Sequence, residues 1–183
     1  MTLVLASYVS DSVVMAADSR VVEYPTGRRS TDRKLFYKWG MGVTSYGQGP
    51  PGVPAAIDDL QGAPTGIGEA ISLLQKRFSV LPRMCALIGA IENGNPCLYR
   101  ASMMGQREHL IPEFGKPIPI WRGGCEVSHE RLAAGSDSAA ELVERMLGIL
   151  RWAAQEERNS VGPPFCYLIV RADGHHEMQT IDA

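Results

Sequence analysis

Short apolar runs joined by pairs of turn-forming residues are the main pattern along this 183-residue chain. Two β-rich runs joined by a polar pair predict a hairpin, and continuous apolar runs indicate strands that are buried on both faces. Asparagine or aspartate followed by glycine favours the positive φ angles of a tight hairpin turn. The three predicted hairpins cover residues 3–17, 84–101 and 165–181, with turns at Ser10-Asp11, Asn93-Gly94 and Asp173-Gly174.

Two segments have the spacing of amphipathic helices. Residues 65–78 carry apolar side chains at intervals of three and four, and residues 138–158 do the same over a longer stretch. Ser138 and Glu141 have the spacing of a capping box at the start of the second helix. Two further short strands are predicted at residues 35–39 and 41–45. The remaining segments are predicted to be irregular: residues 23–34, 47–52 and 102–130, apart from possible strands around 118–121.

This order of elements predicts a single α+β domain over residues 1–183. Hairpins at both ends and in the middle favour antiparallel sheets, and the amphipathic helices need sheet faces to cover. Two antiparallel sheets packed together with helices outside them satisfy both demands.

Composition excludes several classes of function. The formal net charge is −2, which argues against a basic nucleic-acid surface. The four cysteines form no C-x-x-C pair, so neither a zinc ribbon nor a redox motif is indicated. His175 and His176 are adjacent on a predicted strand, point to opposite faces and do not suggest a metal site. The apolar start lacks a basic region and no apolar run reaches 18 residues, so we expect a cytoplasmic protein without cofactor, metal, nucleic-acid or membrane partner.

Thr2 is the first candidate for chemistry. Removal of Met1 makes it the N-terminal residue, with a nucleophilic hydroxyl and an α-amine that acts as general base on the same residue. The ordinary pKa of such an amine is about 8, close to working pH. Asp18 ends the strand that pairs with the strand begun by Thr2, and Lys34 follows at the head of the next predicted strand. A lysine beside the amine disfavours its protonation and stabilises a developing alkoxide, while Asp18 orients that lysine.

These residues carry a resemblance to a known family. Thr2-Leu3-Val4, Ala16-Ala17-Asp18-Ser19-Arg20 and Arg33-Lys34-Leu35 resemble the start of proteasome β subunits and of the bacterial HslV-type peptidase. Later stretches also resemble that family, at Gly94–Tyr99 and at Ala134-Gly135-Ser136. The resemblance implies an αββα four-layer sandwich of two antiparallel sheets flanked by helices, the N-terminal-nucleophile hydrolase fold.

The resemblance also assigns roles to individual residues. It implies that Thr2 is the nucleophile, that Asp18 and Lys34 support it, and that the backbone N–H of Gly47 forms the oxyanion hole. It places Ser136 beside the free amine. The family's later Asp-x-x-Ser pattern is matched at residues 157–160 with a glutamate in place of the aspartate, which makes Ser160 a better candidate than Glu157.

The function implied is that of a threonine endopeptidase subunit. The family assembles into stacked homo-oligomeric rings that enclose their active sites, so we expect self-association, peptide or unfolded-protein substrates and possible work with an ATPase unfoldase. Two alternatives stay open: a small-molecule amidase with the same nucleophile, and a non-catalytic ring subunit in which Met1 is retained.

Overall fold

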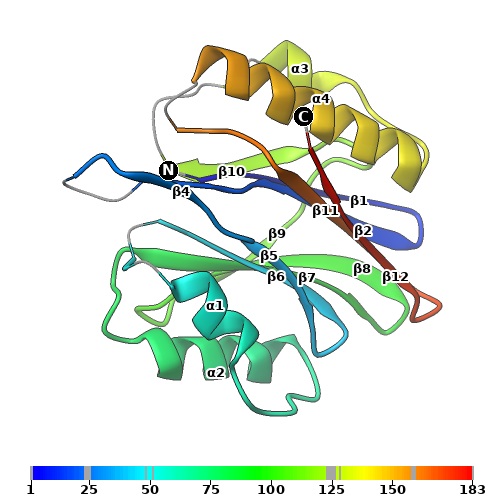
Figure 1. Cartoon of the computed structure of the whole chain (residues 1–183). Helices are drawn as coiled ribbons and strands as arrows, with labels where there is room; N and C mark the ends of the chain where they lie inside the picture. The colour runs from blue at the N-terminus through cyan, green and yellow to red at the C-terminus, as the bar shows by residue number, and fades with distance from the viewer. Residues whose placement is uncertain are drawn as a thin grey trace.

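Antiparallel strands form most of the regular structure in the computed structural model of the chain (Figure 1). The model describes residues 2–22, 26–47, 49–50, 52–122, 127, 129–157 and 160–182. In this described part, strands make up 41% and helices 24% of the residues, and the strands form three sheets.

The first five-stranded sheet contains both ends of the described chain. Its strand order is β10-β1-β2-β11-β12, and every neighbouring pair is antiparallel. The predicted hairpins of β1 with β2 and of β11 with β12 are confirmed. The bounds are β1 (Thr2–Val9), β2 (Ser12–Asp18), β10 (Ile118–Arg122), β11 (Phe165–Arg171) and β12 (His176–Ile181).

The second five-stranded sheet has its strands in the order β5-β6-β7-β8-β9. The hairpin of β7 with β8 is confirmed, and its turn residues Asn93 and Gly94 have the positive φ angles of 52° and 76° that this turn requires. β9 lies in a segment predicted to be irregular, and three of its four residues are polar and exposed. The bounds are β5 (Leu35–Lys38), β6 (Met41–Gly47), β7 (Met84–Glu92), β8 (Asn95–Ser102) and β9 (Arg107–Leu110).

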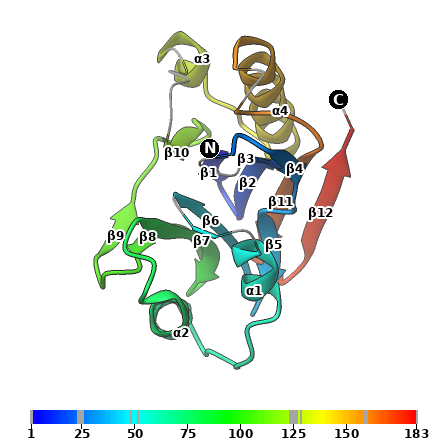
Figure 2. The same ribbon diagram turned by 60° about the vertical axis from the view of Figure 1, so that its left-hand side comes forward.

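A third, two-stranded sheet corrects the predicted fold class. β3 (Arg20–Val22) pairs with β4 (Arg29–Thr31), and β4 lies within residues 23–34, whose polar composition predicts a loop. Figure 2 shows these strands beside the N-terminal end of β1. The structure is therefore mainly antiparallel β, in three sheets, and the expected αββα sandwich of two sheets flanked by helices is wrong. Strands of three residues are too short to show the apolar runs by which strands are recognised in a sequence.

The described residues contain four helices, of which the two longer ones were predicted. The bounds are α1 (Val53–Asp58), α2 (Ile67–Phe78), α3 (His129–Ala133) and α4 (Ala139–Glu156). The Ser138 hydroxyl accepts a hydrogen bond from the Glu141 N–H at 3.3 Å, as the capping spacing predicts. Glu141 reaches back to the N–H of Asp137, one residue before the expected partner.

Apolar packing joins the sheets to one another and to the helices. α4 packs its buried face on β1, β2 and β11, and α2 packs on β7 and β8. The two large sheets contact each other directly, and Gly89 permits this close approach: a Cβ at that position would lie 2.5 Å from Cγ1 of Val13. The packing fixes the ends of β1, β2 and β6 relative to one another.

Leu150→Ala tests the packing of α4. Leu150 has no exposed surface, and shortening it leaves a cavity under the helix, so we expect the free energy of unfolding to fall by about 2–5 kcal/mol. Urea denaturation followed by circular dichroism measures this. Arg151→Ala, on the exposed side of the same turn, is the matched control, and a similar loss in both variants would contradict the packing described.

Candidate active site

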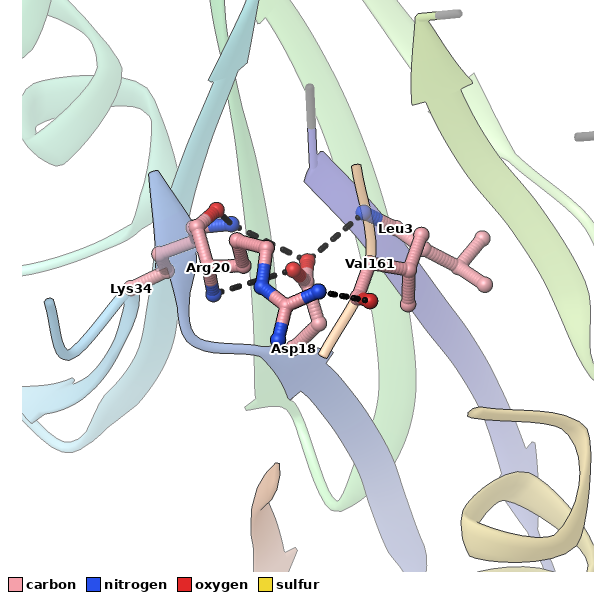
Figure 3. Close-up of polar contacts among 5 residues, drawn as sticks. All are labelled: Leu3, Asp18, Arg20, Lys34 and Val161. Carbon is pink, nitrogen blue, oxygen red and sulfur yellow. Dashed lines mark hydrogen bonds and ion pairs between the residues drawn. The ribbon is translucent and has the colours of Figure 1, made fainter. Parts of the chain in front are cut away.

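Asp18 is the central residue of the candidate site. Its side chain is completely buried at the end of β2, where the chain leaves the first sheet. The carboxylate accepts three hydrogen bonds, from the N–H of Leu3 at 2.8 Å, the N–H of Arg20 at 3.1 Å and Nζ of Lys34 at 3.0 Å (Figure 3). One carboxylate therefore holds the start of β1, the chain after β2 and the residue before β5.

Lys34 is buried as the partner of Asp18. Only 4% of its surface is exposed, and Nζ donates a second hydrogen bond to the carbonyl oxygen of Arg20. Burial is the largest influence on both ionisable groups: it raises the pKa of Asp18 and lowers the pKa of Lys34, and the attraction between the two charges opposes both shifts. The site thus contains a lysine that loses its proton more readily than an exposed one.

Arg20 is a residue that the sequence analysis did not assign a role, although it stands in the same motif as Asp18. Its guanidinium donates to the carbonyl oxygen of Val161 at 3.1 Å, as Figure 3 shows. The N–H of Ser19 donates to the carbonyl oxygen of Gly162 at 3.3 Å. These bonds bring the segment after α4, which includes the buried Ser160, beside the end of β2.

Gly47 and Lys34 line the same pocket, which has a volume of about 80 Å³. Gly47 ends β6 with a φ of 111°, and a Cβ there would lie 2.3 Å from the carbonyl oxygen of Arg83. Only glycine fits this position without a shift of the backbone. Asp32, Ser45 and Tyr46 also line the pocket, so it lies between the end of β6, the residues before β5 and the start of α1.

Thr2 is the first residue of β1, and its Cα is paired with that of Arg122 in β10. Because the N–H of Leu3 is bonded to Asp18, the backbone of Thr2 lies at the same end of the sheet as the Asp18–Lys34 pair. The side chain of Thr2 and all of Met1 lie outside the described part of the structure.

Ser136 lies at the opposite end of β1. Its hydroxyl accepts from Nε of Arg145 at 3.0 Å, and its N–H donates to Gly115, whose own N–H donates to the carbonyl oxygen of Tyr8. Thr2 and Tyr8 are six positions apart along the strand, roughly 20 Å at the usual rise per residue. The structure therefore does not bring Ser136 to the group formed by Asp18 and Lys34, because α4 starts at the far end of the sheet and runs back.

The C-terminal end of α4 lies at the same end of the first sheet as Asp18 and Lys34. Glu157 is the C-terminal capping position of the helix, and its carbonyl oxygen accepts the N–H of Ser160 at 2.8 Å.

Among the described residues, no group of three or more histidine, cysteine, aspartate or glutamate side chains is placed to hold a metal ion. None of the helices in the described ranges is long and apolar enough to cross a membrane.

Comparison with known proteins gives structural neighbours only. The sequence matches no protein-family model and no curated protein. The structure is similar over its full length to 88% of an Anbu (Gly-1) mutant from Hyphomicrobium sp. strain MC1, with a TM-score of 0.73 and 16% identity. It is similar over 98% of its length to 87% of Anbu (ancestral beta-subunit) from Yersinia bercovieri, with a TM-score of 0.72 and 18% identity.

These neighbours correct the resemblance inferred from the sequence. They are Anbu proteins, a proteasome-like but distinct family, and no comparison supports a proteasome β subunit or an HslV-type peptidase. Two of the motifs that carried the resemblance lie at the end of β2 and directly before β5, so they are part of the folded framework. At this level of identity the likeness concerns the fold.

A double-mutant cycle tests the energetics of the Asp18–Lys34 pair. Asp18→Asn or Lys34→Met alone leaves an uncompensated buried charge, and each is expected to lower the free energy of unfolding by about 3–5 kcal/mol. Because burial opposes the charged form of both groups, the double variant is expected to recover most of that loss. Urea denaturation of the four proteins gives the coupling energy. Additive losses would show that the two side chains do not act as a pair.

Proposed function

We propose that this chain is a threonine-type amide hydrolase, a peptidase of proteasome-like fold whose nucleophile is Thr2 after removal of Met1. The observation that carries the proposal is the Asp18 carboxylate, which is bonded both to the N–H of Leu3 and to Nζ of Lys34. A buried ammonium is thereby held next to the residue that follows Thr2. The similarity in fold to a protein described as an ancestral beta-subunit supports the same function.

In the proposed reaction the Thr2 hydroxyl attacks the carbonyl carbon of the substrate amide. The α-amine of Thr2 takes the hydroxyl proton and returns it to the departing amine, which leaves an ester between Thr2 and the acyl group. A water molecule, deprotonated by the same amine, then hydrolyses the ester and restores the hydroxyl. The positive charge of Lys34 disfavours protonation of the amine and stabilises the alkoxide, and Asp18 keeps Lys34 in place.

Gly47 is the proposed donor to the oxyanion. It lines the pocket that Lys34 also lines, and its backbone is fixed by pairing with Met84 in β7. A preorganised N–H at the position where negative charge develops is among the strongest contributions to catalysis of acyl transfer.

The size of the pocket favours a second candidate function. A volume of about 80 Å³ holds a small acyl group, and a small-molecule amidase with the same nucleophile fits such a pocket. Hydrolysis of a peptidyl reporter but not of a short acyl amide supports the peptidase, and the reverse preference supports the amidase. A chain that retains Met1 has no free amine on Thr2 and is expected to hydrolyse neither.

Thr2→Ala tests the nucleophile. Removing the hydroxyl is expected to abolish hydrolysis of both reporters, whereas Thr2→Ser keeps the hydroxyl and the amine and should retain measurable turnover. Intact-mass measurement of each protein shows whether Met1 has been removed, and only proteins without Met1 are compared. Turnover by Thr2→Ala at the wild-type rate would exclude the proposed mechanism.

Gly47→Ala tests the oxyanion donor. The added methyl meets the carbonyl oxygen of Arg83, so the end of β6 must shift, and we expect kcat to fall by about a hundredfold or more. Gly40→Ala is the matched control, because Gly40 also has a positive φ but its Cβ would meet nothing within 4 Å. Steady-state kinetics measure the effect of each substitution on kcat, and an unfolding curve measures its effect on stability. Equal kcat values for the two variants would show that Gly47 does not act as the oxyanion donor.

A further inference from the structure

A second and larger cavity adjoins the catalytic pocket at Tyr46. Its volume is about 620 Å³, and its lining comes from the ends of β6, β7 and β8 and from the start of β9. Tyr46 lines both this cavity and the smaller pocket that contains Lys34 and Gly47. A substrate in the catalytic pocket is therefore next to the larger cavity.

The Tyr46 hydroxyl is buried beside the Cys85 thiol and the Arg100 guanidinium. Only 7% of the residue is exposed, and among the described residues no group makes a hydrogen bond of acceptable geometry with the hydroxyl, although Cys85 and Arg100 are near enough to influence it. Burial raises the pKa of the phenol, and the nearby thiol raises it further, so the hydroxyl keeps its proton. The hydroxyl is itself shielded from solvent, so a ligand in the cavity meets the Arg100 guanidinium.

Arginine side chains make the cavity positive. Arg100 and Arg107 line it together with one carboxylate, that of Glu108, which leaves a formal charge of +1. Arg100 is paired with Glu108, and the side chains of both are about half-exposed, at 46% and 51%. An exposed pair of this kind is weak, and a guanidinium has five N–H donors, so Arg100 can bind a second carboxylate or exchange the first.

We propose that this cavity is a subsite for an acidic side chain of the substrate, whose carboxylate accepts hydrogen bonds from Arg100. The proposal rests on the proposed function, because it takes the substrate to be a peptide held in the adjoining pocket. It adds the class of side chain that the enzyme selects. Glu108 competes with the substrate carboxylate for Arg100 and limits its affinity.

Binding to a protein that cannot turn over tests the subsite separately from catalysis. The probes are fluorescent hexapeptides with blocked ends that carry either one glutamate or one glutamine, and a set of peptides places this residue at each position in turn. The Thr2→Ala protein is titrated into each peptide, and fluorescence anisotropy gives the Kd. We expect the glutamate peptide to bind about tenfold more tightly at one position, as charge-assisted hydrogen bonds predict. A third peptide, with glutamine and a free C-terminal carboxylate, distinguishes an acidic side chain from a chain end.

Variants in the same background assign the preference to the cavity. Arg100→Met is expected to remove the preference for glutamate, and Glu108→Gln to strengthen it. Arg77→Met, on the exposed face of α2, is the matched control and should leave the preference unchanged.

Three results would overturn the subsite: equal affinity for the two blocked peptides, binding of neither at millimolar concentration, or a preference that survives Arg100→Met. Absence of turnover in the wild-type protein together with a preference that depends on Arg100 would count against the proposed catalysis and not against the subsite. Tighter binding of the free C-terminal carboxylate than of the glutamate side chain would also overturn the side-chain assignment.

Discussion

The buried Asp18 carboxylate organises the candidate site. It accepts hydrogen bonds from three segments that are distant in the sequence or change direction there: the start of β1, the chain after β2 and the residue before β5. A buried carboxylate is costly unless it is paired and hydrogen-bonded, so the folded chain must bring all three donors together. The position of the proposed nucleophile and of its supporting lysine follows from this requirement.

The packing of the two large sheets determines what lies around that carboxylate. Direct contact at Gly89 aligns the sheets, and the end of β6 then faces the residues before β5. The small pocket forms at this junction, and Tyr46 separates it from the larger, positively lined cavity. The same packing thus places the proposed chemistry and the proposed recognition of an acidic side chain on either side of one buried phenol.

Much of the fold was predictable from the sequence because its long strands are apolar and its turns have characteristic residues. The hairpins and the helices α2 and α4 were found in this way. The short strands β3, β4 and β9 were missed, since each has only three or four residues and their pairing depends on tertiary contacts. These missing strands are also why the number of sheets, and with it the fold class, was predicted wrongly.

The candidate site was predictable where short sequence motifs place its residues. Asp18 and Lys34 were identified by their spacing and Gly47 by the resemblance to a known family; the structure pairs Asp18 with Lys34 and places Lys34 and Gly47 in the lining of one pocket. Ser136 was placed in the site by a short motif, but the direction of α4 puts it at the other end of β1. Arg20 stands in the same motif as Asp18 and Tyr46 directly precedes Gly47, but their importance arises from contacts with Val161 and from the shape of two cavities, which the sequence does not show.

Covalent labelling by a peptide epoxyketone is the most direct test of the central claim, that Thr2 presents a hydroxyl and a free amine beside the Asp18–Lys34 pair. Such a reagent needs both groups, since it forms one bond to the oxygen and one to the nitrogen of the same residue. The account predicts that mass spectrometry finds the adduct on the peptide that begins at Thr2. Absence of labelling in protein shown to lack Met1, or an adduct on another residue such as Cys85, would contradict it.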